Sequence, residues 1–366
     1  MKRKDPIKVV LVDDSPIALA ILKRILSTDE EIEIVGTAMN GKDALDVIRS
    51  TLPDVICTDL HMPRMNGLEL TRIIMAELPR PILVISSAVQ AEDKQNVFQL
   101  LEAGAVDVFP KPRGGLGLRS DYDALSEQLI QKIKTAYTLQ QSQPAAAKPA
   151  AAKPAAAKPT PLTHPASDDT RWTDIITGVR VVAIGASTGG PQAVKTILTQ
   201  LPFNFPAPII CVLHLTEGFL GGLVDWLAAR CKLKVRIAQG GESPMPRTVY
   251  FPPEGKHLEV DNAGRFVVSS APPHKGHRPS ITVTFNSIAH HYGADAVGII
   301  LTGIGSDGVE GMKSIHRSEG ITIVQDEASS MASLLPKQVI ELGIVSHVVP
   351  LDNMVSTLMA VLAYHQ

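Results

Sequence analysis

One serine of the sequence lies in a context that is typical of a nucleophile. Ser187 is the centre of the run GASTG, which fits the pattern G-x-S-x-G and separates an apolar run from a helix-like segment. Where a strand turns sharply into a helix, this pattern exposes the serine hydroxyl. A nucleophilic serine also needs a base and an orienting acid. His214 follows the apolar run IICVL, and Asp307 follows AVGIILT. Because the carboxyl ends of parallel strands share one edge of a sheet, the three residues could form an acyl-transfer triad.

Two alternative roles for this glycine-rich turn remain open. The turn lacks both the G-x-G-x-x-G pattern of a dinucleotide site and the lysine that ends a Walker loop. Ser187 or Thr188 could instead cap the following helix. The turn could also belong to a module that binds a nucleotide or phosphate without hydrolysis. His214 and Asp307, each at a matching strand end, favour the hydrolase over this alternative.

The remaining histidines are weaker candidates for the base. His274 and His277 lie in the loop-like run PPHKGHRPS, where contact with a substrate is more plausible than proton transfer. His290 and His291 close a helix-like segment, and we expect them on its solvated face.

A second group of reactive side chains stands earlier in the chain, again at the ends of apolar runs. Asp13 and Asp14 follow the first run, Asp59 the third, Ser86 ends the fourth, and Lys111 follows the fifth. Carboxylates that converge at one sheet edge repel one another unless a hard cation such as Mg²⁺ neutralises them. A lysine and a hydroxyl beside them could bind a phosphoryl group.

The elements that must position these residues alternate between strand-like and helix-like segments. Such alternation predicts doubly wound parallel sheets. We expect a five-stranded doubly wound domain over residues 1–125 and a larger doubly wound parallel α/β domain over 179–366. The paired runs around Asn262–Gly264 predict an added β-hairpin in the second domain. Residues 126–178 are expected to form a linker helix and an extended spacer, in which AAAKP occurs three times in succession.

Composition narrows the classes of function. The chain has 35 basic and 37 acidic residues, so it carries no electrostatic footprint for nucleic acid. Three scattered cysteines suit a reducing compartment. The short apolar run near the start ends in two aspartates and does not resemble a signal peptide, and no run is long enough to span a bilayer. We therefore expect a cytoplasmic protein that does not insert into membranes.

Residues 7–125 resemble the receiver domain of two-component response regulators. The motifs VDDSP, DVICTDLHMPRMNGLEL, ISSA and FPKP carry the resemblance. It implies that Asp59 is the phospho-acceptor of a sensor histidine kinase, that Ser86 is the switch hydroxyl and that Lys111 pairs with the phosphoryl group. It also implies that Mg²⁺ is held at Asp59 by Asp13, Asp14 and the backbone carbonyl of His61.

Residues 179–350 resemble the catalytic domain of chemotaxis protein-glutamate methylesterases, through IGASTGGP, HLTEGF, GHRPSITVTFNSIA and LTGIGSDGVEGM. The resemblance implies Ser187 as nucleophile, His214 as base and Asp307 as orienting acid, with Thr188 and the backbone near Ile304 lining the site. The implied substrates are glutamate methyl esters on methyl-accepting chemoreceptors, with glutamine deamidation as a second activity. It implies no cofactor in the catalytic domain, and we expect a monomer.

The sequence departs from both family patterns near these residues. Val108 stands where receivers usually carry an aromatic switch residue. Leu213-His214-Leu215-Thr216 replaces Gln-His-Met-Pro around the base, Ile304 replaces a methionine, and Leu334-Leu335-Pro336 replaces Gly-Met-Pro. As in the family, we expect the unphosphorylated receiver to pack over the serine site.

Overall fold

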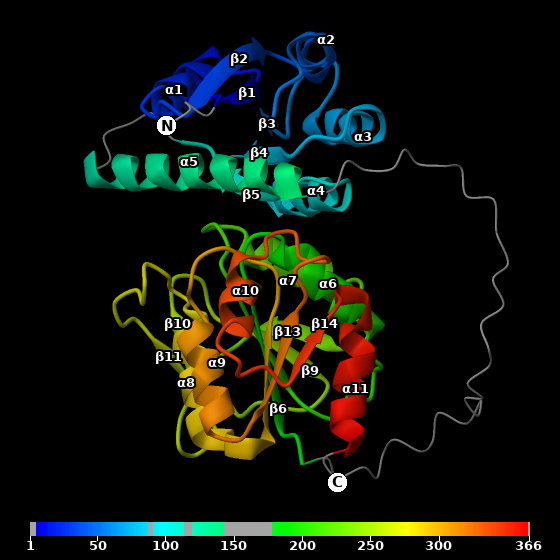
Figure 1. Ribbon diagram of the computed structural model, residues 1–366, viewed down its shortest axis with the longest axis vertical. Helices are drawn as coiled ribbons and strands as arrows, with labels where there is room; N and C mark the ends of the chain where they lie inside the picture. Colours follow the sequence, from blue (N-terminus) through cyan, green and yellow to red (C-terminus); the bar gives the residue numbers. More distant parts are fainter. Residues whose placement is uncertain (1–4, 87–90, 113–118, 143–177, 365–366) are drawn as a thin grey trace, which may run out of the picture.

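The chain forms two α/β units that are joined by a spacer (Figure 1). The structure is a computed structural model, and it describes residues 5–86, 91–112, 119–142 and 178–364. The AAAKP spacer falls outside the described residues. Among the helices of the described ranges, none combines the length and the apolar character that crossing a bilayer requires.

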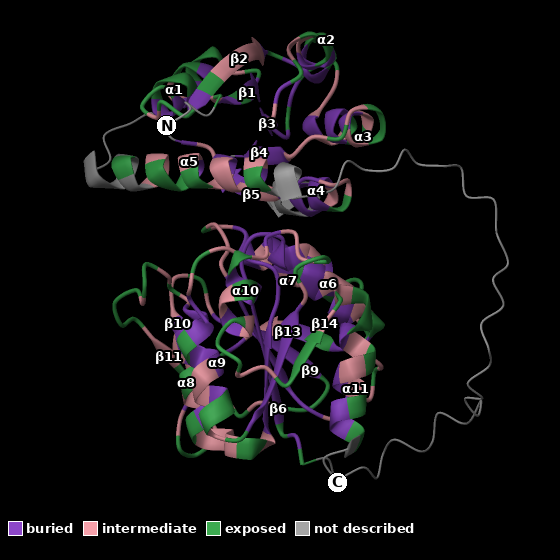
Figure 2. Cartoon of the chain, viewed as in Figure 1, coloured by how far each residue is buried: buried purple, intermediate pink, exposed green. Residues whose placement is uncertain are grey.

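The first unit is built on a five-stranded parallel sheet in the order β2-β1-β3-β4-β5. Its strands are β1 (Ile7–Val12), β2 (Ile32–Ala38), β3 (Val55–Thr58), β4 (Ile82–Ser86) and β5 (Asp107–Pro110). They match the apolar runs of the sequence, and the prediction of a five-stranded doubly wound fold is confirmed. The central strands are buried on both faces, which is what an almost continuous apolar run requires in a parallel sheet (Figure 2).

Local sequence signals set where the helices of this unit begin. Its helices are α1 (Pro16–Leu26), α2 (Gly41–Thr51), α3 (Gly67–Glu77), α4 (Ala91–Glu102) and α5 (Arg119–Ser142). Ser15 caps α1 by accepting a hydrogen bond from the Ala18 amide, and Pro16 occupies the first turn. Asn66 and Glu69 form a reciprocal capping box at the start of α3.

Helix α5 spans the predicted boundary at residues 125 and 126. Its buried Leu129, Ile133 and Ala136 pack against the sheet in the same hydrophobic cluster as α1. The segment expected to begin a linker therefore covers one face of the first sheet, and the exact domain boundaries remain a prediction.

The second unit is built on a seven-stranded parallel sheet in the order β14-β13-β12-β6-β7-β9-β8. Its strands are β6 (Val181–Ala186), β7 (Ile209–Leu213), β8 (Lys234–Ile237), β9 (Thr248–Phe251), β12 (Ala296–Ile300), β13 (Ile321–Gln325) and β14 (His347–Val349). The strand order reverses between β6 and β12, which makes the carboxyl ends of these strands the expected place for a ligand.

A hairpin and a set of helices complete the second unit. The hairpin pairs β10 (His257–Val260) with β11 (Phe266–Ser269), and Gly264 has a φ of +74° in its turn. This is the predicted hairpin, and the larger parallel α/β fold is confirmed. The helices are α6 (Gly190–Gln200), α7 (Leu220–Ala228), α8 (Ile281–Tyr292), α9 (Val309–Arg317), α10 (Leu334–Ile340) and α11 (Met354–Tyr364), with the short 3₁₀ turns η1 (Gly293–Asp295) and η2 (Leu351–Asn353).

Candidate active site

Ser187, His214 and Asp307 follow three adjacent strands of the larger sheet. Strand β6 lies between β7 and β12, and its last residue, Ala186, pairs with Leu213 of β7. The Ser187 amide donates to the Thr302 carbonyl at 3.0 Å, and the His214 amide donates to the Ala186 carbonyl at 3.2 Å. Ser187 thus follows the middle strand of the three, and the residues predicted as base and acid follow the strands on either side.

The acid of this group is tightly held. Asp307 is buried, and its Oδ2 lies 2.9 Å from His214 Nε2. Its carboxylate also accepts hydrogen bonds from the Ser280 hydroxyl at 2.7 Å, the Ile281 amide at 2.8 Å and the Thr282 amide at 3.1 Å. Burial alone raises the pKa of Asp307, but the bonds from His214 and Ser280 outweigh it and hold that pKa below its usual value. Asp307 is therefore a fixed negative charge against one edge of His214.

The other ring nitrogen of His214 is left for proton transfer. Its Nδ1 is buried and has no hydrogen-bond partner among the described residues. Since Nε2 faces Asp307, Nδ1 is the nitrogen that can take a proton from Ser187. No hydrogen bond joins the Ser187 hydroxyl to His214 in the described part of the chain. Such bonds often form only once substrate is bound.

Neither hydroxyl of the serine turn caps helix α6. The capping residue is Gly189, with a φ of +77°, and no side chain bonds to the first turn. The alternative that Ser187 or Thr188 caps the helix is therefore wrong, and both side chains are buried at the strand end without that role. A Cβ added at Gly303 would lie 2.9 Å from the Ser187 Cβ, so only glycine allows the loop after β12 to approach the serine this closely.

Two main-chain amides beside Ser187 are available to a ligand. No described residue accepts a hydrogen bond from the amide of Thr188 or of Ile304, although the neighbouring amides of Ser187 and Gly303 are both paired. Unpaired amides next to a nucleophile are the donors that stabilise an oxyanion. This is the region expected from the sequence to line the site.

His277 and Ser280 reach the site from one loop, and the sequence predicted no contact of His277 with the base or of Ser280 with the acid. The His277 ring stacks on the His214 ring, with centroids 3.7 Å apart and planes 4° apart. Ser280 caps α8 by accepting from the Val283 amide, while its hydroxyl donates to Asp307. The sequence placed His277 near a substrate but gave no signal for a contact with the base. His274 is joined to His277 through the main chain, whereas the described ring contact of His291 is with Tyr292.

The partly buried position of His277 makes the free energy of unfolding depend on pH. Burial, followed by the nearby His214, lowers the pKa of His277 from 6.5 to about 4. Between these values the unfolded chain binds a proton that the folded chain does not bind. We therefore expect the free energy of unfolding to be highest above pH 6.5 and to fall by roughly 1–3 kcal/mol as the pH approaches 4. Urea unfolding of wild type and His277→Phe across this range measures the effect, and equal pH dependence in both would contradict it.

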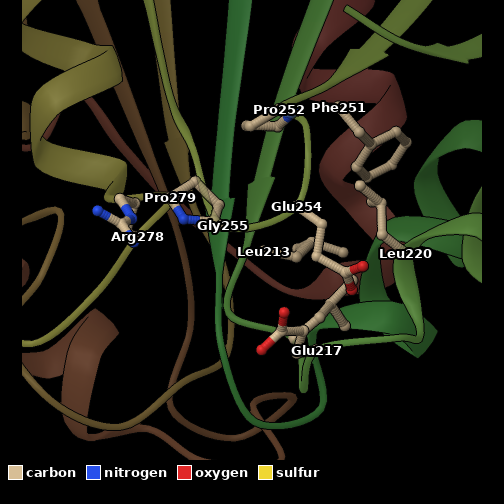
Figure 3. Close-up of a pocket in the computed structure, with 10 residues that line it drawn as sticks. Leu213, Glu217, Leu220, Phe251, Pro252, Glu254, Gly255, Arg278 and Pro279 are labelled. Carbon is tan, nitrogen blue, oxygen red and sulfur yellow. The ribbon is translucent and has the colours of Figure 1, made fainter. Parts of the chain in front are cut away.

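A pocket opens beside the histidines, with a volume of about 100 Å³. Leu213, Leu220 and Phe251 form apolar walls, and the acidic residues Glu217 and Glu254 also line the pocket (Figure 3). Leu213 precedes His214, so the pocket adjoins the base. It could hold part of a polypeptide substrate.

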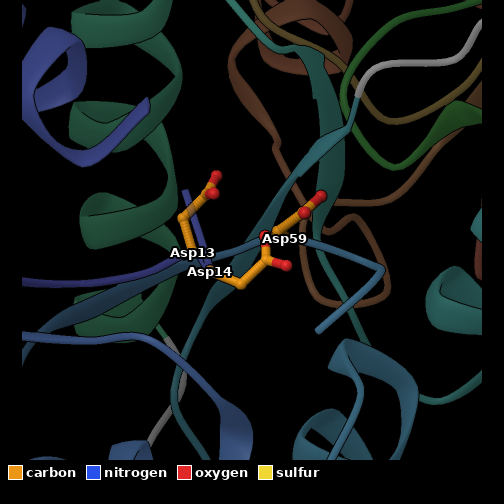
Figure 4. Close-up of side chains that lie close together, drawn as sticks. All are labelled: Asp13, Asp14 and Asp59. Atoms are coloured by element: carbon orange, nitrogen blue, oxygen red, sulfur yellow. The ribbon is translucent and has the colours of Figure 1, made fainter. Parts of the chain in front are cut away.

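The acidic residues of the first sheet converge as predicted. Asp13, Asp14 and Asp59 each offer a carboxylate oxygen, and these oxygens lie within 4.8 Å of one another (Figure 4). Lys111 Nζ lies 2.9 Å from Asp13 Oδ2 and 2.8 Å from Asp59 Oδ2. Ser86 is buried at the end of the neighbouring strand β4. Two buried carboxylates and one exposed carboxylate supply oxygen ligands, which suit a divalent cation such as Mg²⁺.

Charge and burial oppose each other at this acidic site. Burial raises the pKa of Asp59, and Lys111 only partly offsets it. Burial works to lower the pKa of Lys111, but hydrogen bonds to Asp59 and Asp13 outweigh it and raise that pKa. Lys111 therefore stays charged beside the carboxylates, where it can meet an arriving anion. His61, whose carbonyl was expected to be a ligand, has an exposed side chain in the loop after β3.

The first unit packs directly against the edge of the larger sheet that carries Ser187. Val106, in the loop before β5, packs with Ala332, Ile304 and Met331. Thr216 lies two residues beyond His214, and its hydroxyl donates to the Val108 carbonyl at 3.3 Å. Contacts from the first unit thus reach both the loop that contains Ile304 and the segment that follows His214.

A second part of this interface joins helix α4 to α6 and α7. The Phe98 ring stacks on Trp226 with centroids 5.1 Å apart. Lys195 and Arg230 both lie over the Trp226 ring, and both form ion pairs with Glu102, at 2.8 and 3.2 Å. The interface therefore combines apolar packing with ion pairs, and a substitution of Glu102 by a basic residue would reverse one of the charges.

Comparison with known proteins agrees with this architecture. Residues 9–119 match the response regulator receiver domain family, and residues 182–358 match the CheB methylesterase family. A protein-glutamate methylesterase/protein-glutamine glutaminase of Nitrosospira multiformis is 36% identical over 96% of each chain, and one from Nitratidesulfovibrio vulgaris is 39% identical over 96% of this chain and 98% of its own. The catalytic-domain crystal structure of Thermotoga maritima CheB methylesterase is 33% identical, covers 50% of this chain and 98% of its own, and gives a TM-score of 0.48. This chain belongs to the family of receiver-linked protein-glutamate methylesterases/protein-glutamine glutaminases.

Proposed function

We propose that this chain hydrolyses glutamate methyl esters on methyl-accepting chemoreceptors and releases methanol, as part of adaptation in a chemosensory two-component pathway. The observation that carries the proposal is the Asp307–His214 pair at a strand end that neighbours the one before Ser187, with His214 Nδ1 buried and unpaired among the described residues. Family membership supports the choice of substrate, because curated relatives carry this activity in their names. Deamidation of receptor glutamines is a second activity of the same site.

The proposed reaction assigns one role to each of these residues. His214 Nδ1 takes the proton of the Ser187 hydroxyl while the serine oxygen attacks the ester carbonyl. The Thr188 and Ile304 amides stabilise the oxyanion. The intermediate collapses to an acyl-serine, and the proton on Nδ1 passes to the departing methoxide, which leaves as methanol. Water then loses a proton to His214 and attacks the acyl-serine, and that proton passes from Nδ1 to the departing Ser187 oxygen, so that glutamate and free Ser187 result.

The regulation we propose uses the acidic site of the first unit. Asp59 accepts a phosphoryl group from a sensor histidine kinase, Asp13, Asp14 and the His61 carbonyl bind the Mg²⁺ that supports this transfer, and Ser86 and Lys111 bind the phosphoryl oxygens. In the unphosphorylated chain, contacts made by Val106, Val108 and Glu102 hold the receiver over the serine edge. Phosphorylation shifts the docking equilibrium, since it changes charge and loop geometry close to β5.

The experiment that tests the proposed activity is peptide mass spectrometry of methylated receptor membranes incubated with the full chain. We expect methyl glutamate to be converted to glutamate by wild type and not by Ser187→Ala. Ser330→Ala is the matched control, because within the described ranges the Ser330 hydroxyl bonds only to the Asp326 carbonyl. Equal conversion by wild type and Ser187→Ala would contradict the proposal.

A further inference from the structure

The His277 ring covers one face of the proposed base. The two imidazoles are nearly parallel, at 4°, and their centroids are 3.7 Å apart. The two nitrogens of His214 lie on the ring edge, where Nε2 meets Asp307 and Nδ1 is unpaired among the described residues. His277 therefore contacts the part of the base that takes no part in hydrogen bonding.

The loop that carries His277 is fixed at two points. Reciprocal main-chain hydrogen bonds of 3.0 and 2.9 Å join His274 and His277. Further along, the Ser280 hydroxyl donates to Asp307 and the Ser280 amide donates to His257 Nδ1 at 3.2 Å. Since Asp307 also bonds to His214, one carboxylate aligns both the base and the loop that stacks on it.

The charge state of His277 suits contact with a base that becomes a cation. Its pKa is lowered to about 4, first by burial and then by His214, while Asp307 works against this and His274 adds to it. Near neutral pH the ring is therefore uncharged. A neutral aromatic face attracts a cation, whereas a second imidazolium would repel the first.

We propose that His277 is a positioning residue for the ester hydrolysis: its flat, neutral ring fixes the plane of His214, so that Nδ1 points at Ser187, and stabilises the imidazolium that forms there. His277 itself gains and loses no proton, because the proton moves only between Ser187 Oγ, His214 Nδ1, the leaving methoxide and water. This inference rests on the proposed function of Ser187, His214 and Asp307. It differs from the expectation that His277 contacts the substrate.

A small fluorophosphonate separates these two roles. The reagent forms an oxygen–phosphorus bond with an activated serine, fluoride leaves, and the serine proton passes to the base. It makes no contact with a receptor, so its labelling rate reports the Ser187–His214 pair alone. The experiment uses the full chain with Mg²⁺ and beryllofluoride in every sample, and measures labelling rate, kcat and KM for receptor membranes.

The variants are chosen by shape. His277→Leu removes the flat ring, and His277→Phe keeps it without a titratable group. We expect His277→Leu to lower both labelling rate and kcat by roughly 3- to 30-fold, with KM unchanged, and His277→Phe to recover most of the loss. His290→Leu, the same change at an exposed histidine of α8, is expected to match wild type. His277→Asn, which also lacks a ring, replaces His277→Leu if that variant fails to fold.

Two results would overturn the inference. If His277→Leu labels as fast as wild type while KM rises, His277 contacts the substrate instead. If His277→Phe is as slow as His277→Leu, a flat ring is not what the base needs. Failure of the proposed function looks different, because wild type would then label no faster than Ser187→Ala.

Discussion

Asp307→Asn is expected to lower the rate of ester hydrolysis by roughly 10⁴-fold, as the equivalent change does in serine proteases. The carboxylate lies 2.9 Å from His214 Nε2, so it sets which nitrogen carries the proton and stabilises the imidazolium. An asparagine amide in this place can donate to Nε2 and leave the proton on Nδ1. Nδ1 would then be unable to accept a proton from Ser187. Methanol release in a single turnover measures the loss.

The same substitution should also reduce stability, for a reason that the sequence did not show. Asp307 accepts hydrogen bonds from Ser280, Ile281 and Thr282, and an amide nitrogen would face at least one of these donors. An unsatisfied buried donor costs about 1–3 kcal/mol. Asp352→Asn, at an exposed position in η2, controls for the change in charge. Turnover by Asp307→Asn within tenfold of wild type, with the chain folded, would remove Asp307 from the proposed triad.

Glu102→Arg is expected to raise the activity of the unphosphorylated chain by roughly 5- to 100-fold. Glu102 pairs with Lys195 and Arg230 across the interface between the two units. Partly exposed pairs of this kind contribute about 0.2–1 kcal/mol each. Reversing the charge replaces two attractions with two repulsions, which weakens docking by roughly 1–3 kcal/mol. Initial rates of methanol release, without phosphodonor, measure the change.

The control for this prediction is Glu77→Arg. Glu77 also pairs with an arginine, at 2.6 Å, but its partner Arg49 lies within the first unit. We expect its basal rate to match wild type. With beryllofluoride, wild type should approach the rate of Glu102→Arg, because both would then be undocked. A basal rate in Glu102→Arg no higher than in Glu77→Arg would show that this interface does not restrain the enzyme.

Much of the candidate site could be predicted because its residues stand at strand ends. Apolar runs of five or six residues mark β6, β7 and β12, and parallel pairing brings the residues after them to one edge. Ser187, His214 and Asp307 follow from this rule, as does the cluster around Asp59. The rule does not tell which nitrogen of His214 faces Asp307, because that depends on how the side chain turns.

Contacts made by loops and between the two units could not be predicted from patterns. The His277 stack requires the fold of a loop without periodicity, which also contains Ser280. The Phe98–Trp226 contact joins two helix faces whose apolar residues would equally suit the core of their own unit. Helix α5 shows the same limit, because the sequence predicted a linker helix from residue 126 but not that this helix packs on the sheet.

Serine hydrolysis under receiver control is tested most directly by methanol release from methyl-labelled receptor membranes, with the full chain and Ser187→Ala compared with and without Mg²⁺ and beryllofluoride. We expect release that requires Ser187 and increases when beryllofluoride is present. Release that persists in Ser187→Ala, or no release from receptors under either condition, would contradict the claim that a serine esterase under receiver control acts at this sheet edge.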